Sequence, residues 1–521
     1  MPNGRYTFQR RPAAEQGRHQ AYSQALDGEY VFGDDPGTKS PFDTYNDVTK
    51  DLQAIIGECV QQGKRLRARG SLWSLSTAAV TNGRLIDTTN LRVGLDVPKS
   101  LAVPNYAGDV AKLRFVECGN SISALNDYLF DHGLSLKASG SNNGQTIVGA
   151  LSTGTHGGAY KFGAISEMVV GIHLIVGPNK HVYLERQSYP VMKPSFAQML
   201  GAEFKPDDTL FNAALVSFGS FGIIHGLMIE TRPLFALNAL RFKVPYDATL
   251  KAAITACDPT RIPLPPAYAR TVNTDKPYHF ELFVNVNEPA APQNAFLQVM
   301  YETDFTPQNY HPPKWDGGKA GLGADGLNAM GALLNRIPGL IGRLLIVPRL
   351  NETIEEEFAP YQYTAVIRDL FRGEKTLGKT LACGVGMPAS RAVEAMEVAF
   401  KRYRDNGDVL PALLSCRFVK PTKALLGFQR FEPTAVFEMD SVNIPKTRAY
   451  FEQVWADLDA AGIPFTLHWG KYNNYWTPQR LRAHYGNAVD QWIASRKTLL
   501  DGPQVRECFT NPFMESMGLA G

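Results

Sequence analysis

Hydrophobic residues recur at helical spacing from about residue 48, and the chain then changes to short apolar runs. The first pattern predicts an amphipathic helix with Asn46 or Asp47 as its N-cap. Its apolar face is formed by Val48, Leu52, Ile55, Ile56 and Val60. The residues before it, 1–40, are polar with little periodicity, and they predict an extended arm.

The short apolar runs alternate with helical patterns up to about residue 230. They predict strands over residues 64–68, 85–87, 113–117 and 223–230, and helices over 122–129 and 210–217. Gly133 lies where the first of these helices needs a C-cap. The turn sequence Gly177-Pro178-Asn179-Lys180 predicts a hairpin that joins strands 168–176 and 181–185.

The pattern changes after residues 231–233, where we place a domain boundary. Residues 278–287 alternate like an antiparallel strand, a Gly/Pro-rich insertion occupies 306–326, and 434–443 predicts another strand. Helices are predicted at 392–403 and 447–460. The chain is therefore expected to be α+β, with an N-terminal arm (1–40), a first domain (41–232), a second domain (233–465) and a C-terminal segment (466–521).

Composition removes several classes of protein. The 521 residues include 53 Lys and Arg against 50 Asp and Glu, so no strong field favours nucleic acid as a partner. The six cysteines form no C-x-x-C pair, which argues against a disulfide framework or zinc site and favours a reducing, cytoplasmic location. No signal peptide or transmembrane run is evident. The nearest approach, residues 331–350, predicts a buried or lid helix rather than a membrane-surface helix.

One window carries most of the chemistry. Between Lys137 and Lys161 lie 23 residues without Asp, Glu, Lys or Arg, and six of them are Gly. Glycine permits close backbone approach, so successive N–H groups can converge on an anion, and the absence of carboxylates removes repulsion. Composition alone leaves open a loop that merely packs under a sheet.

Two further glycine loops accompany this window, at Gly70-Ser71 and at residues 219–222. Three such loops within about 230 residues favour a large, extended phosphate-containing ligand. Other nucleotide-binding, metal-binding and hydrolase motifs are either absent or lack the secondary structure that they require. There is no Walker loop, no H-x-H or H-E-x-x-H metal pattern, and no G-x-S-x-G elbow. The G-x-G-x-x-G at 321–326 and its looser form at 384–389 lack a βαβ unit, so NAD binding is not expected.

Four segments in this order resemble the vanillyl-alcohol-oxidase-type (PCMH-type) FAD-dependent oxidoreductases, and the aldonolactone and alditol oxidases most closely. The segments are 69–74 (RGSLWS), 141–158 with its Ser-Thr-Gly-Thr-His-Gly core, 215–224 (LVSFGSFGII) and 468–471 (HWGK). The resemblance spans about 40–232 and returns at 410–521. It implies an FAD-binding domain whose loops hold the diphosphate, and a substrate domain, built on an antiparallel sheet, that caps the flavin.

The resemblance also implies which residues bind FAD. They are Arg69, Gly70, Ser71, Leu72, Trp73, Ser74, Gly140, Ser141, Asn142, Gly144, Gln145, Thr146, Gly149, Ser152, Thr153, Gly154, Thr155, His156, Gly157, Gly222 and Ile224. Many relatives have a histidine covalently bonded to flavin at the position of Trp73, and tryptophan cannot form that bond. We therefore expect non-covalent FAD. Gly140 resembles the residue that controls oxygen access in the family. A glycine there leaves space for O2 to reach the flavin, which favours an oxidase. If the alignment with the family is moved by one residue, Ser139 or Ser141 takes this position.

Four residues are the catalytic candidates that the resemblance implies. Lys471 resembles the family's lysine near the flavin, and His468 opens the same motif. Arg417 resembles a substrate-facing Glu-x-Arg arginine, but the glutamate position is Ser415 here, which puts polyol recognition in doubt. Glu438 lies where relatives have a catalytic histidine, and it is either the base or an exposed strand residue. His156 is expected to be a structural hydrogen-bonding residue.

The expected activity is oxidation of a substrate CH–OH group, with hydride passing to FAD and O2 reduced to H2O2. A dehydrogenase with another electron acceptor and a flavin-binding protein without turnover remain alternatives. The expected substrate is a small alcohol, lactone or aromatic molecule, and the aromatic run around Tyr472, Tyr475 and Trp476 favours a flat or apolar one. No metal is expected, and a homodimer is left open.

Overall fold

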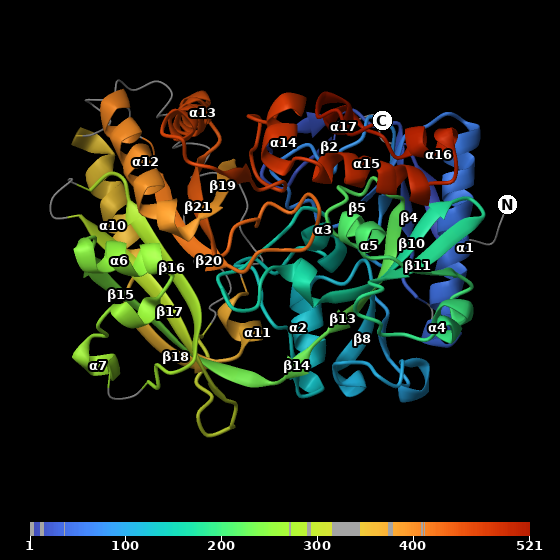
Figure 1. Cartoon of the computed structure of the whole chain (residues 1–521), viewed down its shortest axis with the longest axis horizontal. Helices are drawn as coiled ribbons and strands as arrows, with labels where there is room; N and C mark the ends of the chain where they lie inside the picture. Colours follow the sequence, from blue (N-terminus) through green and yellow to red (C-terminus); the bar gives the residue numbers. More distant parts are fainter. Residues whose placement is uncertain are drawn as a thin grey trace.

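The computed structural model describes residues 5–10, 15–35, 37–269, 272–288, 293–314, 344–372, 379–407, 410 and 412–521. Its elements form two parts that lie side by side (Figure 1). Each part is built on its own large sheet, and the predicted α+β class with an antiparallel second domain is confirmed.

The first part contains a four-stranded and a six-stranded sheet. The four-stranded sheet has the order β1 (Tyr6–Gln9), β4 (Gly28–Phe32), β6 (Arg84–Asp87), β5 (Leu66–Arg69). Strands β4, β6 and β5 are parallel, and β1 is antiparallel to β4. The six-stranded sheet has the order β12 (Glu203–Pro206), β11 (Lys180–Glu185), β10 (Val169–Gly177), β13 (Ile223–Glu230), β8 (Leu113–Glu117), β7 (Gly94–Asp96).

Five helices and two small strand pairs complete this part. The helices are α1 (Pro41–Gln61), α2 (Ile122–Asp131), α3 (Ile147–Ser152), α4 (Pro194–Met199) and α5 (Asp208–Leu215). The strand pairs are β2 (Glu15–Gln16) with β3 (Ser23–Gln24), and β9 (Leu134–Ser135) with β14 (Arg232–Pro233). Helix α1 packs its apolar face against β10, because Val48, Leu52 and Ile55 recur on one side and are fully buried.

The second part is an eight-stranded sheet in which every neighbouring pair is antiparallel. Its order is β18 (Tyr361–Ala365), β15 (Phe235–Pro245), β17 (Asn294–Asp304), β16 (Pro277–Asn285), β20 (Leu413–Val419), β21 (Thr434–Val442), β19 (Thr380–Pro388), β22 (Thr466–Leu467). The helices of this part are α6 (Ala248–Ala256), α7 (Pro266–Ala269), α10 (Val347–Glu357), α11 (Ile367–Leu370), α12 (Ala392–Asn406) and α13 (Pro445–Ala460).

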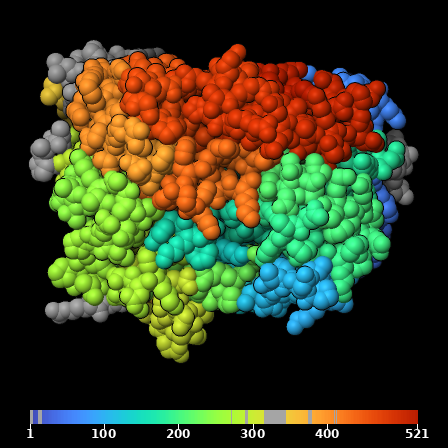
Figure 2. Space-filling model, viewed as in Figure 1, coloured from blue at the N-terminus to red at the C-terminus, as the bar shows by residue number. Residues whose placement is uncertain are grey.

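The C-terminal segment returns to the first part. It carries α14 (Pro478–Tyr485), α15 (Ala488–Leu499), α16 (Pro503–Cys508) and α17 (Pro512–Ser516). Helix α15 packs on α5 and α16 packs on α1. Figure 2 shows the last third of the chain, in orange and red, extending along one side of the molecule over both parts. The segment between β22 and α14 therefore reaches the boundary between them.

Three expectations need correction. The first helix begins at Pro41, and Ser40 is its N-cap, since its Oγ accepts the Asp43 N–H at 3.1 Å; Asn46 and Asp47 lie within the helix. Residues 1–40 are not only an extended arm, because β4 is buried in the four-stranded sheet. Of residues 331–350, 331–343 lie outside the described residues, and α10 has no buried residue.

The described residues contain neither a candidate membrane span nor a candidate metal cluster. No helix there is both long and apolar enough to cross a membrane. Among the residues that the structure describes, no group of three or more His, Cys, Asp or Glu side chains is arranged to hold a metal ion.

Candidate active site

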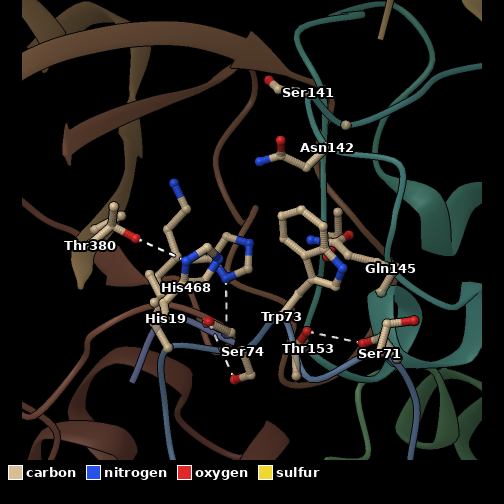
Figure 3. Close-up of a pocket in the computed structure, with 18 of the residues that line it drawn as sticks. His19, Ser71, Trp73, Ser74, Ser141, Asn142, Gln145, Thr153, Thr380 and His468 are labelled. Atoms are coloured by element: carbon tan, nitrogen blue, oxygen red, sulfur yellow. Dashed lines mark hydrogen bonds between the residues drawn. The ribbon is translucent and has the colours of Figure 1, made fainter. Parts of the chain in front are cut away.

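A cavity of about 910 Å³ is lined by both parts of the molecule and by the C-terminal segment. The first part contributes the loops at 69–75, 140–156 and 218–224, and the second contributes strands β16, β19, β20 and β21 together with α10. Figure 3 shows side chains from these separate segments facing one another. The cavity therefore brings together the three glycine loops and the HWGK motif.

Most of the predicted cofactor residues line this cavity. Those that do are Arg69, Gly70, Ser71, Leu72, Trp73, Ser74, Gly140, Ser141, Asn142, Gln145, Thr146, Gly149, Ser152, Thr153, Thr155, His156, Gly222 and Ile224. Three others, Gly144, Gly154 and Gly157, are outside the lining. Two of them allow close packing: a Cβ at Gly157 would lie 2.0 Å from the Ser139 carbonyl oxygen, and one at Gly144 would lie 2.6 Å from the Trp73 ring. Gly154 instead has a φ of 74°, which favours glycine.

Helix α3 begins in the uncharged window and is capped within it. Thr146 is the N-cap, with its Oγ1 accepting the Gly149 N–H at 3.3 Å. The loop at Gly70 packs directly on this cap, because a Cβ at Gly70 would lie 2.1 Å from Thr146 Oγ1. Two of the glycine loops are thus in contact, and only glycine at position 70 allows that approach.

The third loop rests on two buried arginines. Arg67 donates to the Gly219 and Phe509 carbonyl oxygens, and Arg496 donates to the Ser220 carbonyl oxygen at 3.0 Å. Both side chains are fully buried, and Arg496 also donates to the Ala520 and Arg506 carbonyl oxygens. Burial, with the neighbouring Arg496, lowers the pKa of Arg67 to about 9. Two buried positive charges therefore underlie the loop at Gly219.

The two sides of the cavity differ in charge. Lining carboxylates come only from the second part, as Glu281, Glu357, Glu438 and Asp440, whereas the lining from the first part contains none. Buried polar atoms without a hydrogen-bond partner among the described residues include Trp73 Nε1, Gln145 Oε1 and Ser415 Oγ. A carboxylate-free wall of glycine loops with unsatisfied neutral groups fits the diphosphate and ring heteroatoms of FAD.

The carboxylate side is organised around Glu438, which is 1% exposed. Arg417 Nη2 donates to Glu438 Oε2, and Lys471 Nζ lies 2.5 Å from Glu438 Oε1. Arg417 also donates to Ser141 Oγ at 2.7 Å and lies 3.4 Å from Glu281. Three of the four catalytic candidates therefore form one ion-pair cluster, which joins the second domain to the uncharged window. The alternative of an exposed strand residue at Glu438 was wrong.

The cluster fixes the charge of each member. Burial acts to raise the pKa of Glu438, but Arg417 and Lys471 outweigh it and hold that pKa well below its usual range. Burial likewise acts against charge on Arg417 and Lys471, yet their carboxylate partners raise both pKa values. Glu438 is thus a carboxylate held by two cations, which makes it a weak proton acceptor.

Two histidines border this cluster as neutral rings. Burial lowers the pKa of His156 and brings that of His468 well below its usual value. His468 Nδ1 accepts the Gly470 N–H at 2.9 Å, which leaves its hydrogen on Nε2. His156 Nδ1 lies 3.0 Å from the Gly157 carbonyl oxygen, and its Nε2 lies 3.6 Å from Glu438. Both rings line the cavity, and His156 has the loop hydrogen bond expected of a structural residue.

Asp440 is a cavity residue that the sequence reasoning missed. It lies two residues beyond Glu438 on β21, so both side chains project from the same face of the sheet. Its side chain is 46% exposed, and its Oδ1 lies 3.9 Å from Lys471 Nζ. Partial burial in the cavity wall, together with the nearby charge of Glu438, outweighs the opposite effect of Lys471 and raises the pKa of Asp440 to about 6. The i, i+2 spacing of two acidic residues on a predicted strand was the available signal.

The outer part of the cavity is apolar. Phe283 and Phe358 lie 4.7 Å apart between ring centroids, and α10 contributes Leu350 and Ile354. The aromatic residues of the KYNNYW segment are elsewhere. Tyr472 stacks on Trp455, and Trp476 stacks on Trp469. Neither lines the cavity, so that segment gives no reason to expect a flat substrate.

The fold and the divided cavity define the chain as an FAD-dependent oxidoreductase with the PCMH-type fold. A family model for an FAD binding domain matches residues 47–182. The structure is similar to cholesterol oxidase from Brevibacterium sterolicum, with a TM-score of 0.69, 15% identity, and coverage of 99% of this chain and 98% of that one.

The sequence is similar to those of enzymes that act on aldonolactones. L-gulono-1,4-lactone dehydrogenase of Mycobacterium tuberculosis is 25% identical over 454 residues, 86% of this chain and 90% of that protein. D-arabinono-1,4-lactone oxidase of Yarrowia lipolytica is 25% identical over 202 residues, 39% of this chain and 34% of that protein. The cofactor is FAD, as expected.

Proposed function

We propose that the protein is an oxidase that removes two electrons and two protons from a substrate CH–OH group and transfers them to O2, giving a carbonyl product and H2O2. One observation carries this proposal: a single cavity combines a carboxylate-free wall of glycine loops with the Arg417–Glu438–Lys471 cluster. Bound FAD supplies the hydride acceptor. The residues of the chain hold the cofactor, position the alcohol and accept its proton.

The cofactor is held without a covalent bond from position 73. The loops at 69–74 and 140–156 offer backbone N–H groups and neutral side chains to an extended ligand, and the buried Arg67 and Arg496 add positive charge below the loop at Gly219. Burial of these cations costs free energy, and an anionic ligand near the loop offsets part of that cost.

The substrate hydroxyl is positioned by the cation cluster. Arg417 and Lys471 are both charged, both line the cavity and both are fixed by Glu438. Fixed cations stabilise negative charge that develops in the transition state, because they need no reorganisation at that moment. Lys471, which is 21% exposed, retains contact with the cavity while paired.

Asp440 is our choice for the proton acceptor, in place of Glu438. A carboxylate with a pKa near 6 is deprotonated at neutral pH and is a stronger base than Glu438, whose pKa lies well below its usual range. Asp440 also faces the cavity with an exposed carboxylate. In this assignment Glu438 orients the two cations.

Gly140 supports oxygen as the electron acceptor. It lines the cavity beside Ser141, which Arg417 contacts. A Cβ at position 140 would lie 3.2 Å from the His156 carbonyl oxygen and 3.3 Å from Thr155 Cγ2, so even a methyl group there would make a tight contact. Glycine leaves that part of the cavity wall unoccupied, which favours access by a molecule as small as O2.

The substrate class that fits is a small alcohol or lactone. The names of the similar aldonolactone enzymes favour a lactone, and the charged inner part of the cavity suits a hydroxylated group. Phe283 and Phe358 in the outer part accommodate an apolar or aromatic portion, so aromatic alcohols belong in the same test.

The decisive experiment mixes the yellow holoprotein anaerobically with a panel of aldonolactones, polyols and aromatic alcohols, and then admits air. Loss of flavin absorbance with one substrate, followed by its return with release of H2O2, is the expected result. Bleaching that air does not reverse, but an artificial acceptor does, would identify a dehydrogenase, an alternative that the M. tuberculosis relative's name favours. No bleaching with any compound would favour a flavin-binding protein without turnover.

A further inference from the structure

Residues 17–24 lie beside the cavity and contact both parts of the molecule, and we call this segment the strap. It begins with a turn closed by the Gln20 N–H donating to the Gly17 carbonyl oxygen at 2.9 Å. Gln20 has a φ of 52°, and a Cβ at Gly17 would lie 2.9 Å from the Tyr22 ring. The turn is therefore compact, and a side chain at position 17 would displace the Tyr22 ring.

On one side, the strap is attached to the loop at 69–74. The Arg18 N–H donates to the Leu72 carbonyl oxygen at 3.0 Å. The Arg18 guanidinium lies 4.5 Å from the centroid of the Trp73 ring, and the His19 ring meets the same ring edge-on at 5.6 Å. Arg18 and His19 therefore contact the Trp73 ring from the strap. Gly144, in the uncharged window, packs against the same ring.

On the other side, the strap is attached to the second part. Thr380 Oγ1, on β19, lies 3.1 Å from His19 Nδ1, and Asn443 donates to the Gln20 carbonyl oxygen at 3.4 Å. Figure 3 shows His19 between Thr380 and Trp73. His19 is only 6% exposed. The strap thus connects the loop of the first part to the edge of the sheet in the second.

Two side chains of the strap, His19 and Tyr22, line the cavity itself. With Trp73 they form an aromatic wall between the glycine loops and β19. Aromatic rings and a stacked guanidinium suit a planar heteroaromatic ligand, which they contact by stacking and edge contacts.

We propose that the strap is a binding element for FAD, with His19 and Tyr22 in contact with the bound cofactor and Arg18 fixing Trp73 behind them. It retains a cofactor for which position 73 provides no covalent bond. Because the strap completes the cavity wall, cofactor binding and strap docking stabilise each other by the same free energy. This proposal concerns FAD alone, so it holds whichever substrate or electron acceptor the enzyme uses.

The test compares FAD binding by the R18A variant, by the H19A/Y22A double variant and by a matched control. The control is R10A, which removes an exposed arginine outside the strap. Apoprotein is titrated with FAD, flavin fluorescence gives Kd, and circular dichroism with the thermal unfolding of each apoprotein reports folding. We expect about a tenfold rise in Kd for R18A, as for loss of one desolvated cation–π contact, and a larger rise for the pair. R10A should match the unchanged protein.

A second readout uses trypsin on the unchanged protein. Cleavage after Arg18 should be slower with bound FAD than without it, because FAD favours the docked strap. The proposal is overturned if both strap variants fold and bind FAD within twofold of R10A, or if FAD does not protect Arg18. It is also overturned if flavin remains attached to the denatured polypeptide, since retention would then be covalent.

Discussion

Arg417 and Glu438 pair diagonally across two neighbouring strands. The register of β20 and β21 places Ser415 opposite Glu438 and Arg417 opposite Val436, so the ion pair extends across one step of the sheet. Ser415 is too short to compete for Arg417, and its Oγ is buried without a partner among the described residues. Arg417 therefore has a carboxylate partner on the adjacent strand, at position 438.

Replacing Glu438 by glutamine should reduce both stability and activity. The change leaves Arg417 and Lys471 buried without their shared counter-ion, which costs on the order of 3 kcal/mol of unfolding free energy. The cations also lose their fixed positions, so kcat should fall by about 100-fold. Chemical denaturation and steady-state kinetics measure the two effects. D459N, which removes a partly exposed carboxylate paired with Arg480, should change stability by less than about 1 kcal/mol. Full activity in E438Q would contradict the proposed role.

The pH dependence should report Asp440. If it accepts the proton, kcat/KM rises as pH increases through about 6 and then levels off. In D440N the rise should disappear together with most of the activity. A rise near pH 6 that persists in D440N would assign it to another group.

The same two carboxylates act on stability in opposite directions. The pKa of Asp440 is raised on folding, so its contribution is favourable below about pH 4 and is lost as pH increases through about 6. The pKa of Glu438 is lowered, so its contribution is present at neutral pH and is lost as pH falls below its usual range. D440N should therefore gain stability relative to the unchanged protein at pH 7 but not at pH 4, as thermal unfolding at both values would measure.

Flavin should separate from the polypeptide on denaturation, because Trp73 cannot bond to it. After precipitation with acid, yellow fluorescence should remain in the supernatant and none in the protein pellet. Flavin in the pellet would contradict non-covalent binding.

Gly140→Ala should slow reaction with O2 more than reaction with substrate. The new methyl group would be in tight contact with the His156 carbonyl oxygen and Thr155 Cγ2, and it would narrow the cavity beside position 140. Stopped-flow measurement should show a reoxidation rate at least tenfold lower, with anaerobic bleaching much less affected. Equal loss in both half-reactions would indicate only a packing defect.

Gly70→Ala should weaken FAD binding through the packing of two loops. A Cβ there would lie 2.1 Å from Thr146 Oγ1, so the α3 cap must shift, at a cost of about 1–3 kcal/mol. Gly94→Ala is the matched control, since the nearest atom to its Cβ would be 4.0 Å away. We expect a lower melting temperature and a higher Kd for FAD in G70A only. Identical values in the two variants would refute the contact.

Local patterns predicted many elements because their causes are local. Strands β8 and β13 have the predicted bounds, and the β10–β11 hairpin follows from its turn residues. The helix starting at Pro41 was predicted too short, because its first turn has little apolar periodicity and its cap lies at Ser40. The burial of β4 depends on pairing with β6, more than 50 residues away in the chain, which no local pattern contains.

The sequence by itself determined the carboxylate-free loops, since these depend on residue types within short segments, and its resemblance to a known family indicated FAD. The tertiary structure decided how distant segments meet. It placed Lys471 and Arg417 on one carboxylate, added Asp440, and brought His19 of the N-terminal region to Trp73. It also showed that Tyr472 and Trp476 stack on Trp455 and Trp469 and do not line the cavity. The physical reason is that charge pairing and burial are set by distance in space, and sheet register and domain packing fix that distance.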